Sequence, residues 1–576
     1  MQCAIPQDEE GIGMTNCTSS KEKVGLPALE WLLESNDKNP IATFVPVVLA
    51  MVSVVTPNGG LVRKDVRLCL RFADGRSREV VIPVSKLQGV DWFDVDCRCI
   101  LNAEYRGARE GVLQFIRAGI SGAPEEVVYH LEHTGIHRIG DEVIFAAGDR
   151  VLTRSSGMDS APVFELAESS FHLDIDPECA PGEAFAGIME LISLSPKVGR
   201  ALVAHVISGL TRAAFVEAGF VPCAVLTVVG ESGMLKSHYV PQLAQVYNRA
   251  DEVRADTRFN STSRFIEDVL YEHCECTAVI DDLHTAESKG IKKQNESTAE
   301  EIIRRISDDT GRGRMSGNSM VQRKFRGNAV FIGEYVIGKA STIPRSLIVR
   351  LTQRPDGRVL DKYQRHQQLD VSTFYYHFLQ WYVDNFEAVR DEINDDLTRF
   401  RQNNPMSEVH GRLNDTKFYL LTAYKFFLKF SVDSGFCSEQ DAFEEHKEFA
   451  DELSELTRAQ QEWFRKDTEQ AEKVNFLKLI RKLYRNNGFR LASSAEQFDP
   501  TEHDGLIYYE CLCLRGNCLE KKIRKIVSGV KINNIIAELL DQKVLKLVKK
   551  KHTVQINECG GLRFYAIHLN ALEKQH

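Results

Sequence analysis

The chain has 576 residues, a length that predicts about three to four domains rather than one hydrophobic core. Its composition, with 43% hydrophobic and 27% charged residues, is that of an ordinary soluble globular protein. The net charge of −9 excludes binding of nucleic acid through bulk charge, so any DNA contact must come from local basic patches or from a ring that concentrates them.

The start of the chain and its cysteines indicate a cytoplasmic protein without a membrane partner. Residues 1–10 lack the basic and apolar segments of a secretory signal peptide. The 14 cysteines are scattered, which free thiols in a reducing compartment explain most simply. The longest apolar stretch, 41–55, contains Pro46 and falls short of the ~20 residues of a membrane span. We therefore expect it to form a buried strand pair or an interfacial segment.

The N-terminal part predicts an arm followed by a small α+β module. Residues 1–40 are polar with little periodicity, and we expect a loosely ordered arm. The pattern from 41 to 155 is β-rich and is interrupted by one expected helix over 107–118. Residues 156–182 contain three prolines and are expected to form a linker.

Two hairpins are expected inside this module. Residues 66–72 alternate between apolar and polar, Asp74-Gly75 is a turn signal, and 78–84 forms the returning strand. The stretch 136–151 repeats this pattern, with two Gly-Asp turns.

Three Cys-x-Cys pairs raise the question of a metal site. They are Cys97/Cys99, Cys274/Cys276 and Cys511/Cys513, the last with Cys518 nearby. Structural zinc sites usually use a longer C-x₂₋₄-C spacing twice. A spacing of two places both thiols on one face of a strand, so we expect buried strand faces and keep metal binding as the alternative.

Helices and strands alternate from 183 to 355, which predicts a parallel α/β sheet. Two helices lead into an apolar strand over 222–230. Another helix, beginning near Ser263, is expected to bury four apolar residues at helical spacing. These residues are Phe265, Ile266, Val269 and Leu270. Further strands are expected over 276–280 and 329–332.

The first of these strands runs into a sequence typical of a P-loop. In such a loop, backbone N–H groups and a lysine hold nucleotide phosphates, and a hydroxyl holds Mg²⁺. Leu235 stands where the second glycine is usual, and Gly233 appears two residues earlier. An ordinary strand–turn–helix is the alternative interpretation. The residues expected to bind ATP are Gly230, Glu231, Ser232, Gly233, Met234, Leu235, Lys236 and Ser237.

An acidic pair follows the next strand, about 45 residues after Lys236. A P-loop ATPase needs such a group to order Mg²⁺ and the attacking water. We expect Asp281 and Ser237 to hold the metal and Asp282 to replace the usual catalytic glutamate. The shorter Asp282 side chain requires a differently placed water. A solvated acidic turn is the alternative.

Two further residues are candidates for catalysis together with Lys236. The strand over 329–332 should lie between the two preceding strands of an AAA+-type sheet, which puts Glu334 where a polar sensor meets the γ-phosphate or the attacking water. Arg345 precedes another apolar run and is a candidate arginine finger toward a neighbouring subunit's nucleotide. A strand cap and a surface salt bridge are the respective alternatives.

Two local basic patches are candidates for DNA contact. A glycine loop with arginines lies between the second and third strands and suits tracking of phosphates. A run of lysines lies near the C-terminus. Solvated charged surfaces are the alternative for both. The residues expected to contact DNA are Arg312, Arg314, Lys324, Lys549 and Lys550.

The last third of the chain predicts a helical region and a small C-terminal domain. Residues 356–490 are rich in aromatic residues with charged helical faces. In 500–576, a helix over 532–541 is followed by two strands that Gly560-Gly561 joins. This order suggests a winged helix. The expected fold is thus multidomain α/β: an α+β module, an AAA+ P-loop motor, a helical region and a winged helix.

The motifs together resemble those of a bacterial family of replicative helicases from cassette chromosomes and other mobile elements. That family joins an uncharacterised β-rich N-terminal domain to an MCM-like AAA+ motor. The N-terminal match consists of Val80-Val81-Ile82-Pro83-Val84-Ser85, Trp92, Thr134-Gly135-Ile136-His137, Phe145 and Gly148. The motor match consists of Gly230 to Ser237, Asp281-Asp282, Gly311 to Arg314, Gly333-Glu334 and Arg345.

The resemblance implies ATP-driven DNA unwinding in replication by a homo-oligomeric ring, expected to be a hexamer, with ATP and Mg²⁺ as cofactors. A primase or polymerase is an expected further partner. Three departures mark a divergent member: Ile136 replaces a tryptophan, Leu235 replaces the P-loop glycine, and Pro241 falls early in the following helix.

Two functions therefore remain open on the sequence. The first is an ATP-dependent DNA helicase or translocase of a mobile genetic element. The second is a replication initiator or assembly protein that binds ATP with little or no hydrolysis, which Leu235 and Asp282 favour. A phosphotransferase is a third, weaker reading, because the sequence identifies no second phosphate-acceptor site.

Overall fold

The computed structural model describes residues 41–573 apart from a set of short internal stretches. These are 73, 90, 104–105, 157–161, 168–170, 251, 285–288, 310–311, 317–318, 338–341, 404–410, 473–474, 528–529 and 549–550. The expected arm, 1–40, lies outside the described residues. The chain divides into two compact units, Met1–Gln461 and Glu462–His576.

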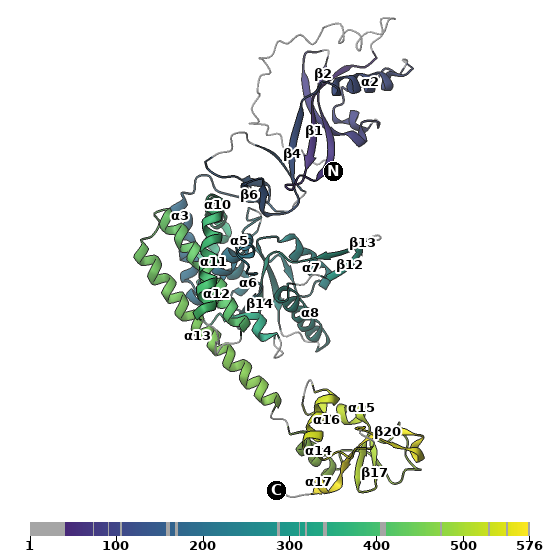
Figure 1. The fold of residues 1–576 in the computed structure, drawn as a ribbon. Helices are drawn as coiled ribbons and strands as arrows, with labels where there is room; N and C mark the ends of the chain where they lie inside the picture. Colours follow the sequence, from purple (N-terminus) through teal and green to yellow (C-terminus); the bar gives the residue numbers. More distant parts are fainter. Residues whose placement is uncertain are drawn as a thin grey trace, which may run out of the picture. The chain divides into compact units, whose positions relative to one another are not determined.

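A five-stranded sheet forms the N-terminal part of the first unit (Figure 1). Its strand order is β3 (Ser77–Pro83), β2 (Leu61–Phe72), β1 (Phe44–Val55), β4 (Glu125–Leu131) and β8 (Val163–Leu166). The expected hairpin is present, because β2 and β3 pair antiparallel. Strand β8 lies within the stretch expected as a linker, and it pairs with β4 in parallel.

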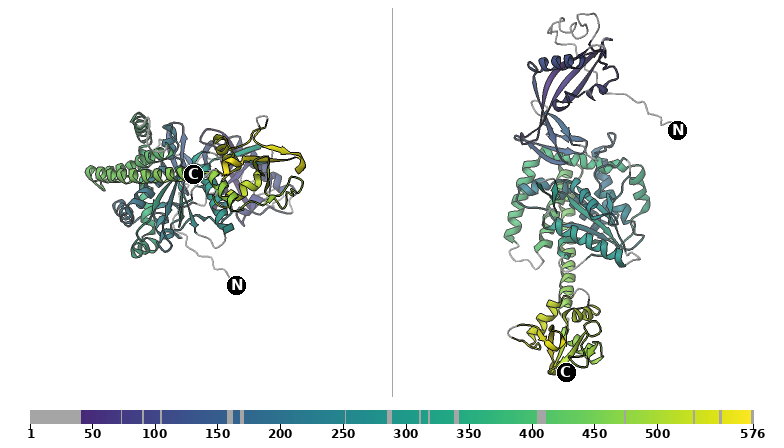
Figure 2. Two further views of the ribbon diagram at one scale, coloured as in Figure 1. Left: turned by 90° about the horizontal axis from the view of Figure 1, so that it is seen from below. Right: turned by 90° about the vertical axis from the view of Figure 1, so that its right-hand side faces the viewer.

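One face of this sheet carries the core of the module. Helix α2 (Ala108–Ile120) packs against β1 on that face (Figures 1 and 2). The rings of Phe44, Trp92 and Phe93 pack together there, with Trp92 and Phe93 centroids 4.2 Å apart.

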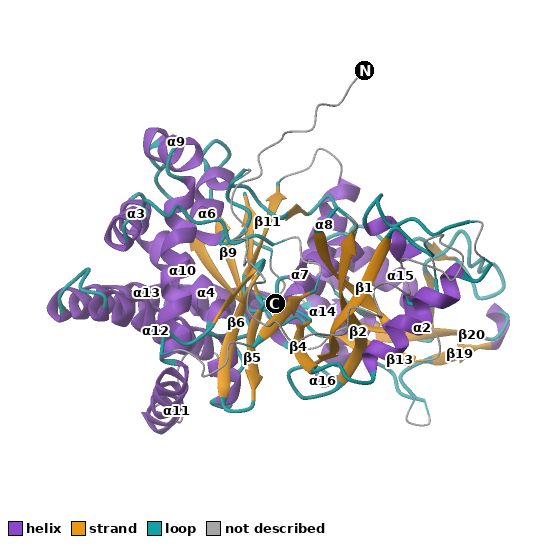
Figure 3. Cartoon of the chain, turned by 90° about the horizontal axis from the view of Figure 1, so that it is seen from above, coloured by secondary structure: helices purple, strands orange, loops and turns teal. Residues whose placement is uncertain are grey.

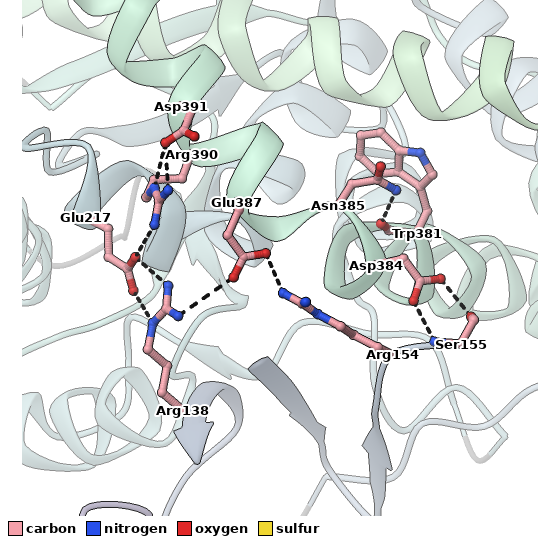
Figure 4. A network of polar contacts seen from close by, with 10 residues as sticks. All are labelled: Arg138, Arg154, Ser155, Glu217, Trp381, Asp384, Asn385, Glu387, Arg390 and Asp391. Atoms are coloured by element: carbon pink, nitrogen blue, oxygen red, sulfur yellow. Dashed lines mark hydrogen bonds and ion pairs between the residues drawn. The ribbon is translucent and has the colours of Figure 1, made fainter. Parts of the chain in front are cut away.

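A second, three-stranded antiparallel sheet links this module to the helices of the same unit. It consists of β5 (Gly135–Ile139), β6 (Glu142–Ala147) and β7 (Arg150–Leu152). Figure 4 shows the polar network that holds it. Arg138 donates to Glu217 at 2.8 and 3.0 Å, Arg154 pairs with Glu387, and the Ser155 N–H and hydroxyl both donate to Asp384 at 2.7 Å.

The centre of the first unit is a five-stranded parallel sheet. Its order is β10 (Thr257–Arg258), β11 (Thr277–Leu283), β14 (Asn328–Gly333), β9 (Val225–Val229) and β15 (Ser346–Arg350). As expected, β14 lies between β9 and β11. A parallel sheet brings the carboxyl ends of its strands to one edge, where ligand sites form.

Successive residues of these strands are buried on opposite faces, so helices cover both (Figure 3). Leu226 and Val228 face the cluster that includes α3 (Pro181–Ser193), α4 (Pro196–Leu210) and α6 (Lys236–Ala244). Val225 faces the cluster with α7 (Ser263–Glu272) and α8 (Lys289–Ser307). The short α5 (Arg212–Glu217) follows α4.

Two expectations for this part of the chain are corrected. On α7, Ile266 and Leu270 are buried, but Phe265 is 53% exposed, because the apolar face that packs on the sheet is narrower than the spacing suggested. The basic glycine loop between the second and third strands is a β-hairpin, β12 (Arg312–Ser316) and β13 (Ser319–Arg323).

Helices follow along the chain in the first unit, and the last of them continues past the end of that unit at Gln461. They are α9 (Gly357–Arg365), α10 (Gln368–Asp384), α11 (Phe386–Asn403), α12 (Gly411–Asp433) and α13 (Glu439–Glu472). Aromatic rings of α10 and α12 interlock, as in the 5.5 Å pair Phe374–Phe427. Helix α13 is tied to α4 by the buried Arg200, which binds Glu445, Glu448 and Glu452.

In its described residues, the second unit contains a five-stranded sheet and a set of helices that follow the end of α13. The helices are α14 (Phe476–Arg485), α15 (Gly516–Arg524), α16 (Ile532–Asp541) and α17 (Leu569–Glu573). The sheet order is β16 (Leu491–Ala492), β17 (Gly505–Tyr508), β18 (Cys511–Leu514), β20 (Leu562–His568) and β19 (Val554–Ile556). The expected helix over 532–541 and the antiparallel pair β19–β20 are present.

The three cysteine pairs differ in their environment. Cys511 and Cys513 are buried in β18, as expected. Cys274 and Cys276 are buried just before β11. Cys97 is exposed in a turn, because the Asp96 carboxylate accepts the Arg98 N–H there and no strand forms. Within the described ranges, no three His, Cys, Asp or Glu side chains are grouped so as to hold a metal ion.

Among the described residues, no helix combines the length and the apolar character that crossing a bilayer requires.

Candidate nucleotide site

The turn between β9 and α6 is shaped by close packing and by two left-handed residues. A Cβ on Gly230 would lie 2.9 Å from the Leu351 carbonyl oxygen, so only glycine fits without a shift. Gly233 has φ 81° and Leu235 has φ 58°. Glycine adopts this conformation freely, whereas an L-residue pays roughly 1–2 kcal/mol for it.

This geometry explains why glycine is usual where Leu235 stands. The leucine keeps the left-handed conformation, and its half-buried side chain packs on the apolar cluster. Its Cδ1 lies 3.8 Å from the position that a Cβ of Gly357 would take at the start of α9.

Helix α6 is short, and a buried arginine compensates for its early end. Pro241 lies inside the helix, as its sequence position indicated. The fully buried Arg249 donates from Nη1 to the carbonyls of Pro241, Gln242 and Gln245, at 3.4, 3.2 and 2.8 Å. Burial lowers the pKa of Arg249 to about 10. Arg249 thereby donates to carbonyls at the helix end, where intrahelical partners run out, in addition to the Gln245 N–H that the Pro241 carbonyl accepts at 3.0 Å.

Lys236 is the first residue of α6 and is only 8% exposed. Its Nζ donates to the carbonyl oxygens of Gly230 and Glu231, at 2.8 and 2.7 Å. Burial lowers the pKa of Lys236, while the nearby carboxylates of Glu334 and Asp281 oppose that effect. The ammonium thus sits inside the turn that precedes it.

The acidic residues lie at the ends of β11 and β14. Asp282 has φ 74°, and its N–H donates to Asp281 Oδ1 at 2.6 Å. The Glu334 N–H donates to the Leu283 carbonyl at 2.9 Å, which ties the two strand ends together.

One pocket of about 300 Å³ joins the turn and the acids. The sequence-predicted residues among its lining are Ser232, Gly233, Met234, Leu235, Lys236, Ser237, Asp281, Asp282 and Glu334. The structure therefore brings together the residues for which the sequence predicted a common site, and Gly230 and Glu231 precede them in the turn.

Sequence reasoning missed two polar residues of this pocket, His238 and His284. His284 Nδ1 lies 2.7 Å from Asp282 Oδ1. Its place two residues after Asp282 was the available signal, since that spacing lets two side chains at a strand end meet.

Arg345 lies outside this pocket. Its Nη2 donates to Asp308 at 3.1 Å, and Arg412 binds the same carboxylate at 3.0 Å. These arginines line a different pocket, of about 200 Å³. Within one chain, Arg345 is therefore not part of the site that contains Lys236.

The predicted DNA-binding residues are only partly described. Arg312 and Arg314 lie on β12, but their side chains are outside the described part. Lys324 Nζ pairs with Asp309 at 3.2 Å. Lys549 and Lys550 lie outside the described residues.

Comparison with known proteins places the fold. No family model and no curated protein matches the sequence. A solved structure described as "SCCmec type IV Cch - active helicase" matches at 13% identity with a TM-score of 0.52, covering 92% of this chain and 95% of that chain. The NrS-1 C-terminal region also matches, at 9% identity and a TM-score of 0.25, covering 88% and 94%. The chain thus has a multidomain α/β fold like that of a helicase.

Proposed function

We propose that this chain is an ATP-dependent DNA helicase or translocase of a bacterial mobile genetic element, acting as a ring in DNA replication. The observation that carries the proposal is the single pocket shared by the turn before α6, the buried Lys236 and the acids at the ends of β11 and β14. The helicase-like fold and the resemblance of the motifs support it.

In this proposal each residue has a defined role. The amides of the turn and the Lys236 ammonium bind the phosphates of ATP, and α6 directs its N-terminus at them. Ser237 and Asp281 offer the oxygen ligands that Mg²⁺ takes, and bound Mg²⁺ would neutralise charge on the phosphates. Asp282 and Glu334 act on the attacking water, and Arg345 serves a neighbouring subunit.

The same proposal assigns the parts of the chain. Residues 41–155 form the N-terminal module, 183–355 the motor, 356–490 a helical region and 500–576 a winged helix. DNA contacts come from the β12–β13 hairpin, Lys324 and the C-terminal lysines. The ring is a hexamer, and a primase or polymerase is its further partner.

DNA-stimulated phosphate release tests the proposal. Wild-type protein should hydrolyse ATP faster with DNA than without, and Lys236→Ala should fall to background. The lysine contacts phosphates in both the bound and the transition state, so its loss should reduce kcat/KM by at least about 100-fold. Equal background rates in both proteins would refute the proposal.

A second function is an ATP-binding initiator or assembly protein that does not turn over. The left-handed Leu235 and the Lys236 ammonium held by its own turn favour it. Tight ATP binding without phosphate release, together with assembly that requires ATP, would support this alternative. Rapid multiple turnover would exclude it.

A further inference from the structure

Asp282 and His284 form a close pair inside the nucleotide pocket. His284 Nδ1 lies 2.7 Å from Asp282 Oδ1 and 3.3 Å from the Asp282 carbonyl oxygen. Both residues line the pocket with Lys236 and Glu334. The pair therefore stands where a P-loop ATPase needs a group that acts on water.

The backbone at Asp282 has an unusual conformation that a neighbouring side chain holds. Its φ of 74° is unusual for a residue other than glycine, and its N–H is held by the Asp281 carboxylate at 2.6 Å. Left-handed conformations at non-glycine residues are retained mainly where surrounding contacts enforce them, and they cluster at functional sites.

The contacts of Nδ1 define which nitrogen of His284 is available. Nδ1 makes a hydrogen bond with the Asp282 carbonyl oxygen at 3.3 Å and lies 2.7 Å from the Asp282 carboxylate. Both oxygens only accept, so the proton of a neutral imidazole resides on Nδ1. Nε2 then carries a lone pair on the opposite side of the ring.

We propose that His284 is the general base for the attacking water and that Asp282 is its positioning residue. This inference rests on the proposed ATPase function. In the step, the water oxygen forms a bond to the γ-phosphorus while the bond from that phosphorus to the β,γ-bridging oxygen breaks. The water proton passes to His284 Nε2. ADP keeps the bridging oxygen, inorganic phosphate leaves, and the imidazolium then releases its proton to solvent.

Asp282 holds the ring in this orientation and stabilises the imidazolium that forms. An aspartate fulfils that role for a catalytic histidine in serine proteases. Other charged or titratable side chains that line the pocket are Lys236, His238, Asp281 and Glu334.

The test uses full-length protein with saturating DNA. Asn at 284 can keep a donor to Asp282 but has no basic nitrogen, so His284→Asn should lower kcat by about 100-fold or more with KM nearly unchanged. Its affinity for a non-hydrolysable ATP analogue should stay within about twofold of wild type. The matched control is His172→Asn, because His172 pairs with Asp149 at 3.7 Å outside the pocket. It should keep the wild-type rate.

Two further measurements separate a chemical role from a structural one. Added imidazole should restore part of the rate of His284→Gly and should not affect wild type. Asp282→Asn should lower kcat alone, yet add little in the His284→Asn background, because the two residues act as one unit.

The outcomes distinguish this inference from the function on which it rests. If His284→Asn hydrolyses ATP like wild type while Lys236→Ala does not, the ATPase stands and the role of His284 is overturned. Loss of analogue binding in His284→Asn, or no rescue by imidazole, also overturns it. A wild-type protein without hydrolysis overturns both.

Discussion

A buried carboxyl at the contact between β5 and the central sheet should make the first unit less stable as pH rises. Glu275 precedes β11 and is only 8% exposed. Burial raises its pKa to about 8, although the Ile136 N–H, which donates to it at 3.1 Å, and the charges of Arg212 and Arg326 favour the ionised form. Gly135 packs so closely on it that an added Cβ would lie 2.6 Å from the carboxyl carbon.

The direction of this pH dependence follows from the protonation of Glu275 in the native and in the unfolded state. The native pKa is raised above that of the unfolded chain, so the native state keeps a proton that the unfolded state loses between about pH 4.5 and pH 8. The stability that the protonated Glu275 gives to the native state is fully present below that pH window and is lost as pH rises through it. The rise of the pKa by about 3.5, from 4.5 to about 8, corresponds to a loss of about 5 kcal/mol at most in the free energy of unfolding.

Glu275→Gln should remove this dependence, because glutamine mimics the protonated acid and does not titrate. Thermal unfolding of the first unit, followed by calorimetry at pH 5.5 and 8.5, measures it. Relative to the variant, wild type should lose stability between the two pH values. Glu132→Gln, at an exposed position, is the control and should track wild type. A difference between Glu275→Gln and wild type that is the same at both pH values would refute the reasoning.

Two further predictions concern backbone conformation. Leu235→Gly should be as stable as Leu235→Ala or more so, because both lose the packing of the atoms beyond Cβ but only glycine relieves roughly 1–2 kcal/mol of left-handed strain. Thermal unfolding of the two variants checks this, and a more stable alanine variant, as is usual inside helices, would contradict it. Gly327→Ala should abolish soluble folded protein, because its Cβ would lie 1.9 Å from the His273 carbonyl oxygen and 2.6 Å from that of Cys276. Gly122→Ala, which meets nothing within 4 Å, should express normally, and equal soluble yields of the two alanine variants would contradict the prediction.

The sequence predicted the central strands well, because the residue pattern that identifies each strand lies within or next to the strand itself. The β-branched run before Gly230 forms β9, and the acids directly follow the buried part of β11. Their convergence follows from the parallel arrangement, which brings strand ends to one edge.

Features that depend on non-local contacts were not predicted. Strand β8 has only four residues, and its pairing with β4 is set by the whole N-terminal sheet. Likewise, the exposure of Phe265 depends on which face of α7 meets the sheet. The β12–β13 hairpin did have a local signal, since Gly317-Asn318 lies between its strands in the sequence and that dipeptide favours a two-residue turn.

The two residues that depart from the expected sequence motifs, Leu235 and Asp282, share one backbone feature. Both have left-handed conformations, at φ 58° and 74°, and both line the same pocket. Leu235 packs on the apolar cluster, whereas Asp282 has a hydrogen bond to Asp281 and a close contact with His284. On the proposed function, the change that binding requires is small: the Lys236 ammonium exchanges the carbonyls of Gly230 and Glu231 for phosphate oxygens.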